Sequence, residues 1–223
     1  YFIIYVDNYH YMATIGYFGD SFCAGREPES WCVLLANKLN ANIVHWGEPG
    51  RSIWSTFFSY ERVVQFNRVP DYSVFCWTEP YRLYHKQLIL SANTERLPHV
   101  NPKIYDALDD YWVYLHDYKK DELAYTYSIK HFDKEILCPL QDKTKIVQTW
   151  SFRPFETAGR HPNITLTAGT FIDESMFNFA KSNQGDKNES AILPNWNNTG
   201  LINHMTAQQN QQWADKIYDR LTS

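Results

Sequence analysis

The amino-acid sequence predicts an α/β fold, in which strands alternate with helices along the chain. Short apolar runs that suit buried strands alternate with segments whose apolar residues recur at helical spacing. The run from Tyr72 to Trp77 is almost continuously apolar, which is typical of a central strand in a parallel sheet. With 223 residues, 44% of them hydrophobic, the chain can bury one sizeable core, so a single domain is expected.

The first half of the chain follows this alternation closely. Strands are predicted at 14–19, 43–46 and 72–77. Leucines from Leu34 to Leu39 recur at helical spacing in the first connection, and Ser52 can cap a helix in the second. Strands joined by helices in this way form a parallel sheet.

The segment 79–142 is longer than one crossover helix and is predicted to be a helical insertion after strand three. Apolar spacing indicates one helix over 108–118 and another over 123–136. Two interpretations remain open. The extra helices either pack over the crevice at the sheet edge or provide an oligomeric or assembly surface.

The last third of the chain is predicted to complete the sheet. Strands are expected at 145–150 and 163–169, which makes about five in all. Thr206 and Gln209 match a capping box, and a stripe of apolar residues follows at helical spacing, formed by Trp213, Ala214, Ile217 and Leu221.

The N-terminal residues, the net charge and the cysteines bear on location and partners. Residues 1–11 have neither a basic region nor a cleavage site typical of a signal peptide. They are expected to be an extension, a fusion remnant or the tail of an upstream domain, with the domain itself at 12–223. The net charge of −4 gives no electrostatic footprint for nucleic acid or for an anionic membrane. Cys32 and Cys76 are expected to be buried, reduced residues.

Ser21 is the candidate nucleophile. It follows Gly19 and Asp20 at the carboxyl end of strand one, the edge at which open α/β sheets bind ligands. An Asp-Ser turn without chemistry is the alternative interpretation. No phosphate-binding loop, dinucleotide fingerprint or zinc pattern is present in the sequence, so neither a cofactor nor a metal is expected.

Gly19-Asp20-Ser21, Gly50 after strand two and His204 just before the last helix together resemble the SGNH (GDSL-like) hydrolase superfamily. The resemblance covers the chain from about Thr14 to its end. It implies a three-layer, flavodoxin-like α/β/α fold and hydrolysis of esters. It also implies that Ser21 attacks, that His204 is the base, and that the N–H groups of Ser21 and Gly50 form the oxyanion hole.

Two positions depart from the family pattern. Glu79 stands where the family has an asparagine that donates to the oxyanion, and a carboxylate there would repel negative charge. Leu201 stands where the family has the aspartate that orients the histidine, so a carbonyl near Leu201, Glu79 or Asp173 would have to replace it. The form of the third block, from Trp77 to Arg82, resembles a divergent branch of phage- and bacteria-encoded proteins.

Several side chains near the predicted strand ends are candidate substrate contacts. Arginines can hold a carboxylate or phosphate, and aromatic faces can stack on a sugar; ion pairing and ordinary packing are the alternatives. These candidates are Trp46, Arg51, Trp77, Tyr81, Arg82 and Arg153.

Two functions of different classes follow from the sequence. The first is an SGNH-like serine esterase that acts on small esters, including O-acetyl groups of a glycan. The second is an SGNH fold that serves as a binding or structural module, for example in a phage assembly. The expected location is cytoplasmic or virion-associated.

Overall fold

The fold is built on a five-stranded sheet. A computed structural model describes residues 12–85, 88, 90–91, 96–152, 164–182 and 204–223. The strand order is β2-β1-β3-β4-β5, and all neighbouring strands are parallel. The strands are β1 (Ala13–Gly19), β2 (Ala41–His45), β3 (Tyr72–Trp77), β4 (Lys145–Trp150) and β5 (Thr170–Ser175). The predicted α/β class and the parallel sheet of about five strands are confirmed.

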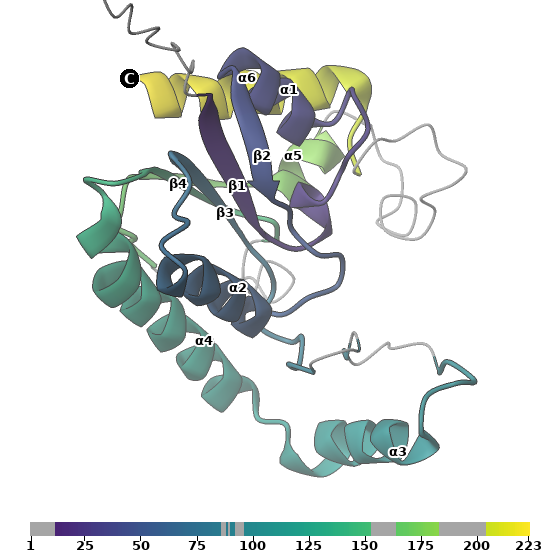
Figure 1. Cartoon of the computed structure of the whole chain (residues 1–223). Coiled ribbons are helices and arrows are strands. Elements are labelled where there is room, and N and C mark those ends of the chain that lie inside the picture. Colours follow the sequence, from purple (N-terminus) through teal and green to yellow (C-terminus); the bar gives the residue numbers. More distant parts are fainter. Residues whose placement is uncertain (1–11, 86–87, 89, 92–95, 153–163, 183–203) are drawn as a thin grey trace, which may run out of the picture.

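Helices cover both faces of the sheet (Figure 1). On one face lie α1 (Trp31–Lys38) and α6 (Ala207–Thr222), with the short helix α5 (Met176–Ser182) beside them. On the other face lie α2 (Ile53–Gln65) and α4 (Tyr118–Phe132). The protein is therefore a three-layer α/β/α structure, as predicted.

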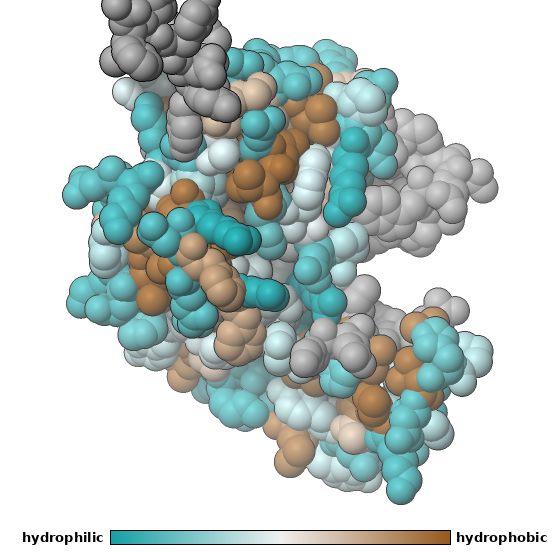
Figure 2. Space-filling model, in the orientation of Figure 1, coloured by the Kyte–Doolittle hydropathy of each residue, from teal (hydrophilic) through white to brown (hydrophobic). Residues whose placement is uncertain are grey.

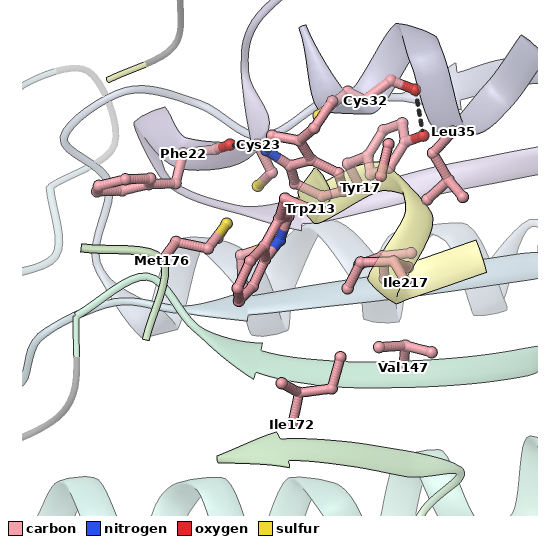
Figure 3. Packing of buried hydrophobic residues seen from close by; sticks show 14 of the residues in the cluster. Tyr17, Phe22, Cys23, Cys32, Leu35, Val147, Ile172, Met176, Trp213 and Ile217 are labelled. Atoms are coloured by element: carbon pink, nitrogen blue, oxygen red, sulfur yellow. Dashed lines mark hydrogen bonds between the residues drawn. The ribbon is translucent and has the colours of Figure 1, made fainter. Parts of the chain in front are cut away.

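The core on the α1–α6 face is rich in large aromatic side chains (Figure 3). The Tyr17 hydroxyl donates to the carbonyl of Cys32 at 2.5 Å, and the Trp31 indole N–H donates to the carbonyl of Phe22 at 2.6 Å. Trp213 of α6 packs into the same cluster. Because buried polar atoms need partners, these bonds fix the orientation of the rings. They also anchor Phe22, which is the residue after Ser21.

The core on the α2–α4 face contains Trp77, which corrects one prediction. Trp77 is fully buried, stacks on Phe75 with 5.3 Å between ring centroids, and donates its indole N–H to Gln148 at 3.1 Å. Phe132 of α4 closes over it. A residue enclosed in this way cannot stack on a substrate, so the assignment of Trp77 as a substrate contact was wrong.

The insertion after β3 is helical, as predicted, but it is divided differently. α3 (Pro102–Asp110) continues into a π-helical turn over Tyr111–Leu115, and α4 begins only at Tyr118. His116 is extended, and the Asp117 carboxylate caps α4 by accepting the Lys120 N–H at 2.8 Å. The predicted helix over 108–118 was therefore wrong at its end, because a capping aspartate interrupts its apolar spacing.

The arm that carries α3 extends away from the sheet (Figure 1), and apolar side chains reach the surface on this part of the molecule (Figure 2). Three consecutive residues of the π-helical turn are more than 60% exposed, namely Val113, Tyr114 and Leu115. This surface is the strongest observation in favour of an assembly role for the insertion.

The predicted fifth strand at 163–169 was also wrong. Residue 163 lies outside the described residues, and 164–169 are not a strand; β5 begins one residue later, at Thr170. Ile164, Leu166 and Ala168 are buried and alternate along the chain like strand residues. However, the N–H groups of Thr167 and Ala168 donate to the Asp133 carboxylate, at 2.8 and 3.0 Å, instead of to a neighbouring strand.

Candidate active site

Ser21 lies in the first turn after β1, as predicted. Asp20 follows the strand in an extended conformation, and its carboxylate accepts the Phe22 N–H at 3.1 Å. An aspartate in this position caps the start of a helix, and a single 3-10 turn follows over Ser21–Cys23. Ser21 is 8% exposed, so it retains a small accessible surface at the carboxyl edge of the sheet.

The Asp20 carboxylate is fully buried and joins the ends of three strands. Its Oδ1 accepts a second hydrogen bond, from the hydroxyl of Ser151, at 2.7 Å. Its Oδ2 accepts one from the hydroxyl of Thr78 at 2.7 Å and pairs with the Arg82 guanidinium at 3.2 Å. Thr78 is the first residue after β3, and Ser151 is the first after β4. A buried carboxylate with this many donors fixes the turn that follows β1.

The loop after β2 is hydrogen-bonded to the same turn. The Gly47 N–H donates to the Cys23 carbonyl and the Glu48 N–H donates to the Gly19 carbonyl, each at 3.0 Å. A Cβ atom at position 47 would lie 2.4 Å from Cys23 Sγ and 2.7 Å from the Asp20 carbonyl oxygen. The close approach of the two loops therefore requires glycine at this position.

Gly50, the predicted second oxyanion donor, lies three residues further along this loop. Its φ of 71° is in the left-handed region, which glycine adopts without strain. Gly50 is half-buried, and α2 begins shortly after it. The structure thus places Gly50 on a loop that is bonded to the turn of Ser21.

His204 is buried, with 8% of its surface exposed, and its ring lies 4.6 Å from the ring of Phe22. Its φ of 67° is unusual for a residue with a side chain, and such conformations cluster at functional sites. Ser21 and His204 are 183 positions apart in the sequence. Ser21 directly precedes Phe22 in the chain, and the ring of His204 packs against the ring of Phe22.

The position of His204 depends on the start of α6. The predicted capping box is confirmed, because the Thr206 hydroxyl accepts the Gln209 N–H at 3.2 Å and the Gln209 side chain accepts the Thr206 N–H at 2.8 Å. Asn210 donates to the carbonyl of Met205 at 3.3 Å and accepts the N–H of Trp31 at 2.8 Å. These contacts attach the residues after His204 to α1.

Glu79 is held in an ion pair. Its Oε1 accepts the Nε–H of Arg82 at 2.9 Å, while the same guanidinium contacts Asp20 and lies 5.2 Å from the centre of the Phe152 ring. The Arg82 side chain is 11% exposed, whereas the Glu79 side chain is 38% exposed, so the pair reaches the surface on the Glu79 side. Glu79 therefore stands beside the site as a compensated charge and not as a hydrogen-bond donor.

The other predicted contacts have structural partners. Arg51 pairs with Glu48 at 2.7 Å and donates to the carbonyl of His85 at 3.1 Å. The half-buried Trp46 has the Arg26 guanidinium 5.6 Å from its ring centre. Tyr81 packs against the ring of Tyr118, with 5.0 Å between centroids.

Cys23 lies two residues after Ser21 but is not suited to be a nucleophile. Cys23, Cys32 and Cys76 are free and fully buried, as expected for the latter two. Burial raises the pKa of each of these thiols above its ordinary value. Because the thiolate is the reactive form, the neutral thiols leave Ser21 as the nucleophile candidate.

Of the predicted replacements for an orienting aspartate, the two carboxylates have other partners. Asp173 accepts the indole N–H of Trp150 at 3.3 Å, and Glu79 is bound by Arg82. Leu201 and Arg153 lie outside the described residues.

Among the residues that the structure describes, no group of three or more His, Cys, Asp or Glu side chains is placed to hold a metal ion. No helix in the described part of the chain is long and apolar enough to cross a membrane.

Sequence reasoning missed the residues that support the site. Asp20 was recognised only as part of a turn, and Gly47, Thr78, Ser151 and Asn210 were not singled out. One signal was available: Thr78 and Ser151 are the hydroxyl residues that directly follow β3 and β4, where parallel strands end at one edge.

No known family model matches this chain, and no curated protein sequence matches it either.

Proposed function

We propose that this chain is an SGNH-type serine esterase that hydrolyses small carboxylic esters, with O-acetyl groups of a glycan as the substrate class. The observation that carries the proposal is that the ring of His204 lies 4.6 Å from the ring of Phe22, the residue that follows Ser21 in the turn after β1. The rigid turn around Asp20 and the loop of Gly50 support it, because a nucleophile and its oxyanion donors must be preorganised.

The reaction begins with attack of the Ser21 hydroxyl oxygen on the ester carbonyl carbon, while His204 accepts the hydroxyl proton. The N–H groups of Ser21 and Gly50 stabilise the oxyanion. Collapse expels the alcohol, which takes the proton from His204, and leaves the acyl group on Ser21. A water molecule then attacks this ester with His204 as base, which releases the carboxylic acid and restores the enzyme.

The ion pair of Glu79 and Arg82 makes the site compatible with this chemistry. An isolated carboxylate beside the oxyanion would oppose the reaction, whereas a guanidinium at 2.9 Å compensates its charge. Because Leu201 stands where the resembled family has the aspartate that orients the histidine, turnover is expected to be slow; loss of such a group lowers kcat about 10⁴-fold in a serine protease.

A fluorophosphonate probe tests the proposal, because only an activated serine forms the covalent adduct. Intact-mass analysis should show one adduct on the wild-type protein, and peptide mapping should place it on Ser21. The Ser21→Ala variant should show none, while Ser128→Ala, which removes a hydroxyl in the groove between α2 and α4, should label like the wild type. Equal labelling of wild type and Ser21→Ala would reject the esterase function.

The second candidate function is a binding or structural module of an assembly, for example in a phage. The exposed apolar turn at 113–115 favours it. A protein that is not labelled at Ser21 and whose hydrolysis of p-nitrophenyl acetate is the same in Ser21→Ala would have this function instead.

A further inference from the structure

A pocket of about 170 Å³ lies between the loop after β3, the start of α2 and the helical insertion. Half of its lining residues are aromatic, among them Trp54 from α2, Tyr81 and Tyr84 from the loop, and Tyr111 and Trp112 from the insertion. Aromatic side chains on three separate segments give the pocket apolar faces that can hold a flat ring.

The charged residues of this pocket have opposite signs. Arg82 lines it from one element and Asp121 from another. Because these two charges offset each other, the lining residues favour neither a cationic nor an anionic ligand. A neutral ligand with hydroxyl groups can accept from Arg82 and donate to Asp121, so these walls favour a polyhydroxylated compound with an apolar face.

Trp112, one of the lining residues, also carries a buried donor. The indole N–H of Trp112 is buried and has no hydrogen-bond partner among the described residues. Buried donors are nearly always paired in folded proteins, and an exception needs an explanation. A ligand oxygen in the pocket would supply the acceptor.

Arg82 connects the pocket to the candidate active site. The guanidinium that lines the pocket is 3.2 Å from the carboxylate of Asp20, which directly precedes Ser21. We propose that this pocket binds one pyranose ring of the substrate. The proposal rests on the esterase function only in the statement that the bound sugar carries the acyl group toward Ser21.

Binding is tested without acyl transfer by using unacetylated methyl glycosides of glucose, galactose and N-acetylglucosamine. The indole N–H signals of the full-length protein are followed by ¹H–¹⁵N NMR during the titration, and Trp112→Phe and Trp54→Phe assign two of them. At least one glycoside should shift the Trp112 signal, with a Kd on the order of 1 mM for a ligand of about a dozen heavy atoms.

Two variants and a control locate the binding. Trp54→Ala, which removes a wall residue that is 42% exposed, and Trp112→Phe, which removes only the donor, should each weaken binding about tenfold. Tyr114→Ala on the same arm lies outside the pocket and should leave Kd unchanged. The proposal is overturned if no glycoside shifts the Trp112 signal up to about 50 Kd, if both variants bind like the wild type, or if only tetramethylammonium shifts it.

The outcomes also separate this inference from the proposed function. Ser21→Ala should bind the glycosides like the wild type, because Ser21 does not line the pocket. A protein that binds them but is not labelled by the fluorophosphonate would retain the pocket and lose the esterase function. A protein that is labelled by the fluorophosphonate but binds none of the glycosides would support the esterase function and refute the pyranose-binding pocket.

Discussion

Replacement of Asp20 by asparagine should destabilise the protein by about 3 kcal/mol. The side chain keeps its shape, but one carboxylate oxygen becomes an NH₂ group. If Oδ1 is replaced, the Phe22 N–H and the Ser151 hydroxyl lose their acceptor, although Ser151 can turn to the Cys76 carbonyl at 3.3 Å. A buried donor that is left without an acceptor costs roughly 1–3 kcal/mol.

Replacement of Oδ2 gives the same result. The Thr78 hydroxyl and the Arg82 guanidinium lose their acceptor, and only Arg82 has another partner, Glu79 at 2.9 Å. In either orientation of the new amide, one buried donor is left without an acceptor. The remaining hydrogen bonds are no longer made to a charged group, which costs about 1 kcal/mol or more. A loss of about 3 kcal/mol is a large share of the roughly 5–15 kcal/mol by which domains are stable.

Urea unfolding followed by circular dichroism measures this loss. Asp110→Asn changes an exposed aspartate in the same way and should alter the free energy of unfolding by less than about 0.5 kcal/mol. A double-mutant cycle with Arg82→Met isolates the ion pair and should give a coupling of about 1 kcal/mol or more. If Asp20→Asn costs less than about 1 kcal/mol, the carboxylate does not hold the turn and the account of a preorganised Ser21 fails.

Three further predictions follow from the site. Gly47→Ala should cost about 2–3 kcal/mol in urea unfolding, because its Cβ would lie 2.4 Å from Cys23 Sγ; an unchanged midpoint would contradict the loop contact. Since burial raises the pKa of three thiols, the folded protein holds their protons more tightly than the unfolded chain. The contribution of these thiols to stability should therefore be constant below about pH 8.5 and fall as the pH rises above it, and urea midpoints that stay level from about pH 8.5 to pH 10 would contradict this. Glu79→Gln should change the rate of p-nitrophenyl acetate hydrolysis less than about threefold, since Arg82 already compensates the charge; a loss of tenfold or more would show that Glu79 orients His204.

The sheet could be predicted well because its signals are local. Four of the five strands and the cap of α6 were recognisable from apolar runs and capping residues alone. The fifth strand was misplaced because 164–168 shows the alternation of a strand while its N–H groups bond to Asp133, which lies more than thirty positions earlier. Periodicity reports which side chains are buried, and it does not report which acceptor takes the backbone donors.

The site was predictable in part for the same reason. Ser21, Gly50 and His204 each follow or precede a recognisable element, so their places relative to the strands and to α6 could be inferred from the chain. The role of Asp20 could not, because its partners come from the ends of two other strands and become neighbours only when the sheet is assembled. Trp77 was misjudged because its burial under Phe132 depends on how the insertion folds back.

Glu79 shows how a departure from a family pattern can be offset within the same segment. The sequence placed a carboxylate where an oxyanion donor was expected, and that substitution alone argues for a disabled site. The structure adds that Arg82, three residues later, binds Glu79 and also Asp20. One guanidinium therefore faces two carboxylates, one in the turn of Ser21 and one beside it, and it also lines the aromatic pocket. Because Arg82 joins the nucleophile turn, the altered third block and the pocket, a substitution of Arg82 would disturb all three at once, whereas a change confined to Glu79 would leave the pairing with Asp20 in place.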